Sequence, residues 1–372
     1  MGAQPKWFYI VELLNTEFLG QPLRLEASMA GWQVLYWGNQ PVAGKKADGL
    51  ADGDFSLNFE LKDQSTNQQI QCQLNFSLHW QPFSFNYELL VNNEQMGQGE
   101  RGVHDIERQT PAVKPKVKRD TSMIGMLSLG FKLFKSAKII KVVLAGASLA
   151  AYSWLFSLPF ALSLLACLVV HEYGHIRAMK HFGMPTKGIY LIPFMGGLAL
   201  SDGKINTRWQ DVVISMMGPF FGLGMSLLAL IAYWITGEIF FAGIAAFNSL
   251  LNLFNLLPIL PLDGGHILKS ISFSMNSIVG LVLCGLGAGL GVLISYSFGL
   301  ALLGFLLLIG SIEIFFEWKM RHQSHLLPLD RYGQVFSAIW YLVTVAGLVG
   351  IIFYLAGTGD AMLGLPLKIL NS

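Results

Sequence analysis

The stretch Val170-His171-Glu172-Tyr173-Gly174-His175 lies in the middle of a long apolar segment. In an α-helix, side chains four residues apart lie on one face, so His171 and His175 can direct their ring nitrogens at one metal ion. Glu172 can then reach a water molecule bound to that ion. Ionisable side chains within hydrocarbon are energetically unfavourable and usually mark functional sites. The stretch therefore indicates a zinc hydrolase site inside a membrane helix.

The composition of the 372-residue chain is that of a membrane protein with additional soluble mass. Hydrophobic residues make up 53% and charged residues 13% of the chain, and the mean hydropathy is +0.50, far from the average of soluble proteins. The net charge is only +2 and no basic patch with interleaved aromatic residues is present, so nucleic acid is not expected as a partner. The three cysteines are widely separated, which argues against a disulfide framework or a cysteine zinc site.

Residues 1–110 show the two-residue alternation of β-strands. Segments 23–27, 55–61 and 72–78 each place apolar residues on one face and polar residues on the other. The turn signal at Val91-Asn92-Asn93-Glu94 lies between two strand-like runs, as in a β-hairpin. We therefore expect a soluble, mainly β, sandwich-like domain. It holds no constellation of catalytic residues, so a binding or regulatory module that recognises a partner is the expected role.

The rest of the chain is expected to be an all-α polytopic membrane protein. Residues 111–138 are predicted to form a basic linker and an interfacial segment. About 20 apolar residues are needed for each helix that crosses the hydrocarbon, and by this measure we expect about seven transmembrane helices. They are expected near residues 139–157, 160–182, 210–233, 237–257, 277–297, 299–317 and 335–356. Residues 139–275 would form the catalytic membrane core, and residues 276–372 would supply additional C-terminal helices.

The positive charges of the loops predict how the chain lies in the membrane. Loops containing residues 177–187, 204–208 and 319–331 carry Lys and Arg, whereas those at 157–159 and 236–238 carry none. By the positive-inside rule, the N-terminal domain lies in the cytoplasm and the C-terminus lies outside. The bacterial cytoplasmic membrane is the expected location. Glu172 would then lie about 10 Å below the cytoplasmic interface, at a rise of about 1.5 Å per residue.

Asp263 is the candidate for a third metal ligand. A catalytic zinc ion takes three protein ligands and leaves one position for water. A later membrane helix ends in FNLLPILPLDGGH (254–266), where two prolines break the helix and two glycines allow a sharp turn. Because that helix also descends toward the cytoplasm, Asp263 arrives on the same side of the membrane as the two histidines. His266 is three residues from Asp263 and could approach the ion as well.

The pairing of HEYGH in one membrane helix with NLLPILPLDGG in a later one resembles the site-2 protease family, peptidase family M50. These are intramembrane zinc metalloproteases that cut membrane-embedded segments of other proteins. The resemblance covers about residues 139–275 and includes Phe194-Met195-Gly196-Gly197 and Met217-Gly218-Pro219. Tyr173 stands where leucine is commoner in the family, and His266 stands where arginine is frequent.

The resemblance implies that His171, His175 and Asp263 bind Zn²⁺, that Glu172 is the catalytic carboxylate and that Asn255 assists at the site. The resemblance favours Asp263 over His266 as the third ligand, so His266 is expected to lie beside the ligands. Neither departure from the family's pattern affects an implied ligand. The implied substrate is a membrane-anchored protein whose transmembrane segment enters the site.

Two features of the sequence concern the surroundings of the site. Asn248, Asn252 and Asn255 are spaced at i, i+4 and i+7, which gives one polar stripe on a membrane helix. We expect Asn255 to bind substrate or an oxyanion, and the other two amides to hold helices together. Segment 190–200, with Gly196 and Gly197 at its centre, is too short to span and predicts a re-entrant hairpin. Its edge either pairs with an extended substrate segment or plugs the cavity.

The expected function is hydrolysis of peptide bonds in membrane-anchored proteins, within or near the lipid bilayer. Metal-bound water would attack the peptide carbonyl, and Glu172 would accept the proton of the water and deliver it to the leaving amine. An alternative is a catalytically inactive membrane scaffold of the same fold that binds client proteins, although a scaffold has no use for Glu172. A metal transporter would need acidic and histidine residues across the whole membrane, whereas here they gather at one depth.

Overall fold

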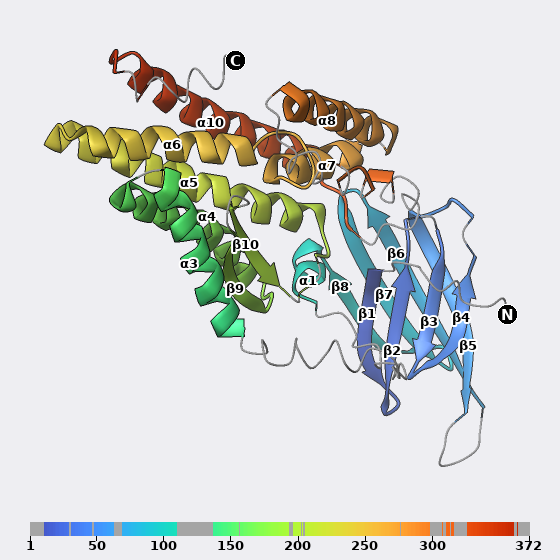
Figure 1. Ribbon diagram of the computed structural model, residues 1–372. Helices are drawn as coiled ribbons and strands as arrows, with labels where there is room; N and C mark the ends of the chain where they lie inside the picture. Colours follow the sequence, from blue (N-terminus) through green and yellow to red (C-terminus); the bar gives the residue numbers. More distant parts are fainter. Residues whose placement is uncertain are drawn as a thin grey trace, which may run out of the picture.

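The computed structural model of the chain has a β-rich N-terminal region beside a mainly helical region (Figure 1). The described residues are 11–29, 31–46, 48–62, 69–109, 137–155, 157–192, 196–201, 203, 205–275, 277–297, 307, 310–312, 314–315, 326–360 and 363. The expected basic linker at residues 111–138 lies almost entirely outside them.

The N-terminal region consists of two four-stranded antiparallel sheets, in the orders β1-β2-β3-β4 and β5-β6-β7-β8. The strands are β1 Val11–Phe18, β2 Gln21–Ala27, β3 Gln33–Trp37, β4 Gln40–Lys45, β5 Gly53–Lys62, β6 Gln69–Trp80, β7 Phe83–Val91 and β8 Glu94–Arg101. Leu25 of β2 and Phe76 of β6 belong to one buried cluster. The two sheets therefore share a core, as the alternating pattern predicts.

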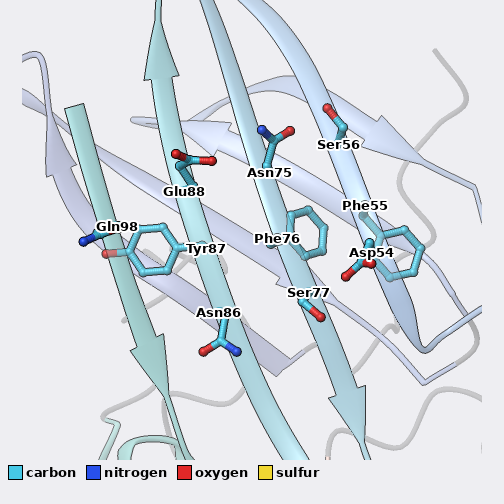
Figure 2. Close-up of a pocket in the computed structure, with 10 residues that line it drawn as sticks. All are labelled: Asp54, Phe55, Ser56, Asn75, Phe76, Ser77, Asn86, Tyr87, Glu88 and Gln98. Atoms are coloured by element: carbon cyan, nitrogen blue, oxygen red, sulfur yellow. The ribbon is translucent and has the colours of Figure 1, made fainter. Parts of the chain in front are cut away.

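Side-chain alternation sets the two faces of the second sheet. Leu74, Phe76 and Leu78 of β6 are buried, and the residues between them face outward. On the outer side, polar residues such as Asn75 and Glu88 line a depression (Figure 2). The β7–β8 turn contains Asn92 and Asn93 at positive φ, 48° and 68°, which is the backbone of a tight hairpin turn. The predicted hairpin is confirmed.

The helical region contains α3 Ala137–Leu155, α4 Leu158–His181, α5 Arg208–Thr236, α6 Ile239–Asn255, α7 Asp263–Met275, α8 Ser277–Ser297 and α10 Arg331–Ala356. Among the described helices, α4, α5 and α10 are long and apolar enough to cross a membrane, and α3, α6 and α8 contain shorter apolar stretches. The expected count of about seven spans is not confirmed, and the span expected at 299–317 lies mostly outside the described residues. Helix α7 was not expected, because two glycines follow its first residue.

A two-stranded sheet interrupts the helical region between α4 and α5. Strand β9, Thr186–Ile192, pairs antiparallel with β10, Gly196–Ser201. Both strands contact α4, and β9 also contacts α3. The predicted hairpin is therefore present, and it lies against the helix that carries both histidines.

Helices α4, α5 and α6 approach one another closely at glycines. A Cβ atom on Gly174 of α4 would collide with the carbonyl oxygen of Met217 in α5, and one on Gly222 of α5 would collide with the amide of Asn252 in α6. No side chain other than hydrogen fits in such contacts. Because these helices lie so close together, side chains from all three can meet in one buried group.

A short helix, α1 Val103–Arg108, connects the two regions (Figure 1). The Asn206 side chain donates to the carbonyl oxygen of Ile106 at 3.1 Å, and the Gln210 side chain donates to that of Glu107 at 2.9 Å. The side chain of Leu327 is buried in the β-sheet core, and its backbone forms a bridge with Thr207. The N-terminal region thus packs against the first turn of α5 and the residues just before it.

Candidate active site

Three side-chain atoms from two helices converge in the helical region. His171 Nε2 and His175 Nε2 of α4 lie 3.1 Å apart. Asp263 Oδ2, at the start of α7, lies 3.4 Å from the first and 3.5 Å from the second. A tetrahedral zinc ion with bonds of about 2.0–2.1 Å holds its ligand atoms about 3.3 Å apart. The triangle therefore has the size of one face of a tetrahedral zinc site.

Hydrogen bonds at the far ring nitrogens set the protonation of both imidazoles. His175 Nδ1 lies 2.7 Å from the carbonyl oxygen of Ile214, which can only accept, so Nδ1 donates and a neutral ring leaves a lone pair on Nε2. His171 Nδ1 lies 2.7 Å from Asn252 Oδ1 and takes the same form. Two lone pairs and a carboxylate oxygen this close together repel one another unless a cation lies between them. The donor set of His171, His175 and Asp263 fits a zinc ion.

Asn252 extends the site into a buried amide chain. Its Oδ1 atom accepts from His171, while its Nδ2 atom donates to the carbonyl oxygen of Asn248 at 2.8 Å. Asn248 in turn donates to the Gly222 carbonyl oxygen and to Ser226 Oγ on α5, at 2.9 and 2.8 Å. Asn248 therefore bridges two helices as predicted. The contact of Asn252 with His171 was missed, although the polar stripe 248–252–255 contained the signal.

The break between α6 and α7 places Asp263. Helix α6 ends at Asn255, and the chain turns back so tightly that a Cβ atom on Gly264 would collide with the carbonyl of Leu256. One on Gly265 would collide with the backbone of Ile259. The two glycines are therefore required by the turn, and the turn sets Asp263 opposite the histidines.

Glu172 lies beside the three converging atoms and beneath the β9–β10 hairpin. One carboxylate oxygen of Glu172 and one ring nitrogen of each of His171 and His175 lie within 4.8 Å of one another. A Cβ atom on Gly197 would lie 2.5 Å from Glu172 Oε1, and the backbone N–H of Ala199 interacts with the same carboxylate. Because Gly197 has no side chain, the Glu172 carboxylate can occupy this space. Glu172 is only 5% exposed, so the hairpin shields it from bulk solvent.

The remaining predicted residues lie further from the converging atoms. Asn255 is the last residue of α6, and among the described contacts its side chain makes no hydrogen bond to the histidines or Asp263. Gly196 begins β10, opposite Ile192. His266 lies on α7 with its Nδ1 atom 3.7 Å from Asp211 Oδ1 of α5, so it faces a second carboxylate.

Comparison with known proteins finds a similarity for the helical core. Residues 159–242 and 235–280 match the family model of peptidase family M50. Residues 159–280 are therefore similar to peptidase family M50. This M50-like region contains His171, Glu172, His175 and Asp263, and it excludes the β-rich N-terminal region.

Proteins similar to this region are found in bacteria and archaea. A Synechocystis protein whose name includes the words zinc metalloprotease, sll0528, is 31% identical over 199 residues, which are 52% of this chain and 47% of the relative. Zinc metalloprotease MJ0392 of Methanocaldococcus jannaschii is 31% identical over 201 residues, 52% of this chain and 58% of the relative. The chain thus matches about half the length of these relatives. A solved structure of a site-2 protease from M. jannaschii covers 50% of this chain and 89% of its own, at 24% identity and a TM-score of 0.33.

Proposed function

We propose that this protein is an integral-membrane zinc endopeptidase that hydrolyses peptide bonds of membrane-anchored proteins within or beside the bilayer. The convergence of His171 Nε2, His175 Nε2 and Asp263 Oδ2 at 3.1–3.5 Å carries the proposal. The match of residues 159–280 to the family model of peptidase family M50 supports it. The three residues hold the metal ion, and Glu172 is the catalytic carboxylate.

The chemistry follows from the residues that face the ion. Zinc, when bound, supplies an acidified water and a Lewis acid for the peptide carbonyl. Glu172 takes the proton of the attacking water and delivers it to the leaving amine. Asn252 and the Ile214 carbonyl keep the Nε2 atoms of the histidines unprotonated and aimed at the ion. Asn255 would approach the substrate only at the mouth of the site, where α6 ends.

The β9–β10 hairpin is proposed to hold the substrate in an extended form. Peptide carbonyls in a helix are occupied by hydrogen bonds, so a protease must unwind the segment it cuts. The edge of β10 that does not pair with β9 faces Glu172 through Ala199, and a substrate strand added there would run past the catalytic carboxylate. Gly196→Pro should therefore abolish cleavage while zinc content stays normal. Gly197 is a poorer test, because a new side chain would also displace Glu172.

The proposed orientation places the N-terminal region in the cytoplasm and the C-terminus outside, in the cytoplasmic membrane of a bacterium. Its support is the concentration of Lys and Arg in the loops that would face inward. The N-terminal region is proposed to be a regulatory module that binds a partner, since it is seated on α5, which contacts both histidines.

A Glu172→Gln variant tests the proposal against the inactive scaffold. Both proteins are expressed in the native host, and fragments of membrane proteins are compared at equal expression and equal zinc content. The proposal expects fragments only with the wild-type protein, because glutamine cannot accept the proton. Identical fragments in both would reject it, and no fragments in either would favour the scaffold.

A further inference from the structure

A second buried carboxylate lies in the first turn of α5, apart from the converging ligands. Asp211 is 5% exposed. Its Oδ2 atom accepts a hydrogen bond from Ser270 Oγ at 2.5 Å, and its Oδ1 atom lies 3.7 Å from His266 Nδ1. The buried side chains of Arg208 and Lys269 lie close enough to interact with the same carboxylate. Asp211 therefore joins α5 to α7 through several contacts in the protein interior.

The α7 residues that meet Asp211 share a face with Asp263. Asp263, His266 and Ser270 stand at positions i, i+3 and i+7, which lie along one side of a helix. A rotation or slide of α7 that separates Ser270 from Asp211 would therefore also move the Asp263 carboxylate. Asp263 is the first residue of α7, so its place depends on where the rest of that helix is held.

The same part of α5 also supports the histidines. Ile214, three residues after Asp211, provides the carbonyl oxygen that accepts from His175 Nδ1 at 2.7 Å. A Cβ atom on Gly218, one further turn along, would collide with the His175 ring. One helix thus determines the distance between the ligands on α4 and the ligand on α7.

We propose that Asp211 is a positioning residue that sets the place of Asp263, and thereby the affinity of the metal site, through its hydrogen bond to Ser270. This inference rests on the proposed function, because it takes Asp263 as a ligand. A buried charge cluster that only stabilises the fold would leave zinc affinity unchanged once the protein is folded. The two roles therefore differ in their effect on the metal.

Two serines of α7 provide a matched pair of variants. Both hydroxyl groups are buried, but Ser270 Oγ donates to Asp211, whereas Ser274 Oγ donates to the Ser270 carbonyl oxygen and accepts from the Leu329 N–H. Zinc affinity is measured on folded, detergent-solubilised protein by competition with a chelator. Cobalt(II) is bound to the same proteins, and its visible spectrum reports the coordination geometry.

We expect Ser270→Ala and Asp211→Asn to weaken zinc binding by about 10-fold or more, the effect typical of residues that orient metal ligands. Their cobalt spectra should shift toward that of Asp263→Asn. Ser274→Ala should retain wild-type affinity and spectrum. Wild-type affinity in both Ser270→Ala and Asp211→Asn would overturn the inference, as would an equal loss in Ser274→Ala.

The His171→Ala variant separates the two proposals. If His171→Ala loses zinc while Ser270→Ala and Asp211→Asn bind it normally, the role of Asp211 is wrong and the metal site stands. If His171→Ala binds zinc as tightly as the wild-type protein, the metal site itself is wrong.

Discussion

Replacing Gly218 by alanine should destroy the metal site while leaving helix α5 intact. A Cβ atom at this position would lie 2.9 Å from His171 Nε2 and closer still to the His175 ring, whereas an ordinary contact begins at 3.4 Å. His171 would have to withdraw by about 0.5 Å and His175 by more, and metal sites tolerate about 0.2 Å in ligand distances. His175 cannot swing aside without breaking its bond to the Ile214 carbonyl.

We therefore expect zinc affinity to fall at least about 100-fold, the upper end of the effects seen when metal ligands lose their orientation. Chelator competition on purified protein measures this directly. Gly224→Ala is the matched control, because it lies in the same helix and a Cβ atom there meets nothing within 4 Å. It should bind zinc normally and be more stable by about 0.5–1 kcal/mol, since alanine favours the helix. Normal zinc binding by Gly218→Ala would refute the proposed position of the ligands.

Three other changes test separate parts of the structure. Asn252→Leu leaves His171 Nδ1 without its acceptor, so zinc affinity should fall about 10- to 100-fold. Asn255→Leu should bind zinc normally. Normal zinc binding by Asn252→Leu together with weakened binding by Asn255→Leu would show that Asn255, not Asn252, supports the histidine. Gln210→Ala removes a donor to the Glu107 carbonyl and a cap of α5. The free energy of unfolding should fall by about 1–2 kcal/mol, and hydrogen exchange in α1 should become faster. Unchanged exchange would show that Gln210 does not hold α1 against α5. Burial raises the pKa of the Cys72 thiol from 9.0 to about 11. The free energy of unfolding should therefore fall between these pH values, because the thiol of the unfolded chain loses its proton first. Cys72→Ala should lack this loss, and identical pH profiles of stability for the variant and the wild-type protein would contradict the shift.

The sequence predicts most of the geometry of the proposed metal site because helical periodicity is a local property. His171 and His175 are four residues apart, so their shared face follows from the helix alone. Asp263 could be proposed as the third converging residue because prolines and glycines mark the end of a neighbouring helix. Alternating residues in β6 likewise predict which side of the sheet is buried.

Other features depend on how helices are rotated against one another, which sequence spacing does not determine. Asn248, Asn252 and Asn255 are equivalent members of one stripe, and only the packing of α6 on α4 selects Asn252 as the partner of His171. In the sequence, Asp211 is an ordinary polar residue near the start of a helix, and only the packing of α7 on α5 brings Ser270 into contact with it. Helix α7 was not predicted, because Gly264 and Gly265 are strong turn signals and yet lie in its first turn.

The most direct test of the central claim is a comparison of the wild-type protein with Glu172→Gln and Asp263→Ala, measuring zinc content and cleavage of a membrane-anchored substrate together. We predict one zinc ion per chain in the wild-type protein and in Glu172→Gln, loss of zinc in Asp263→Ala, and cleavage by the wild-type protein alone. Cleavage by Glu172→Gln at the wild-type rate, or full zinc content in Asp263→Ala, would contradict the account.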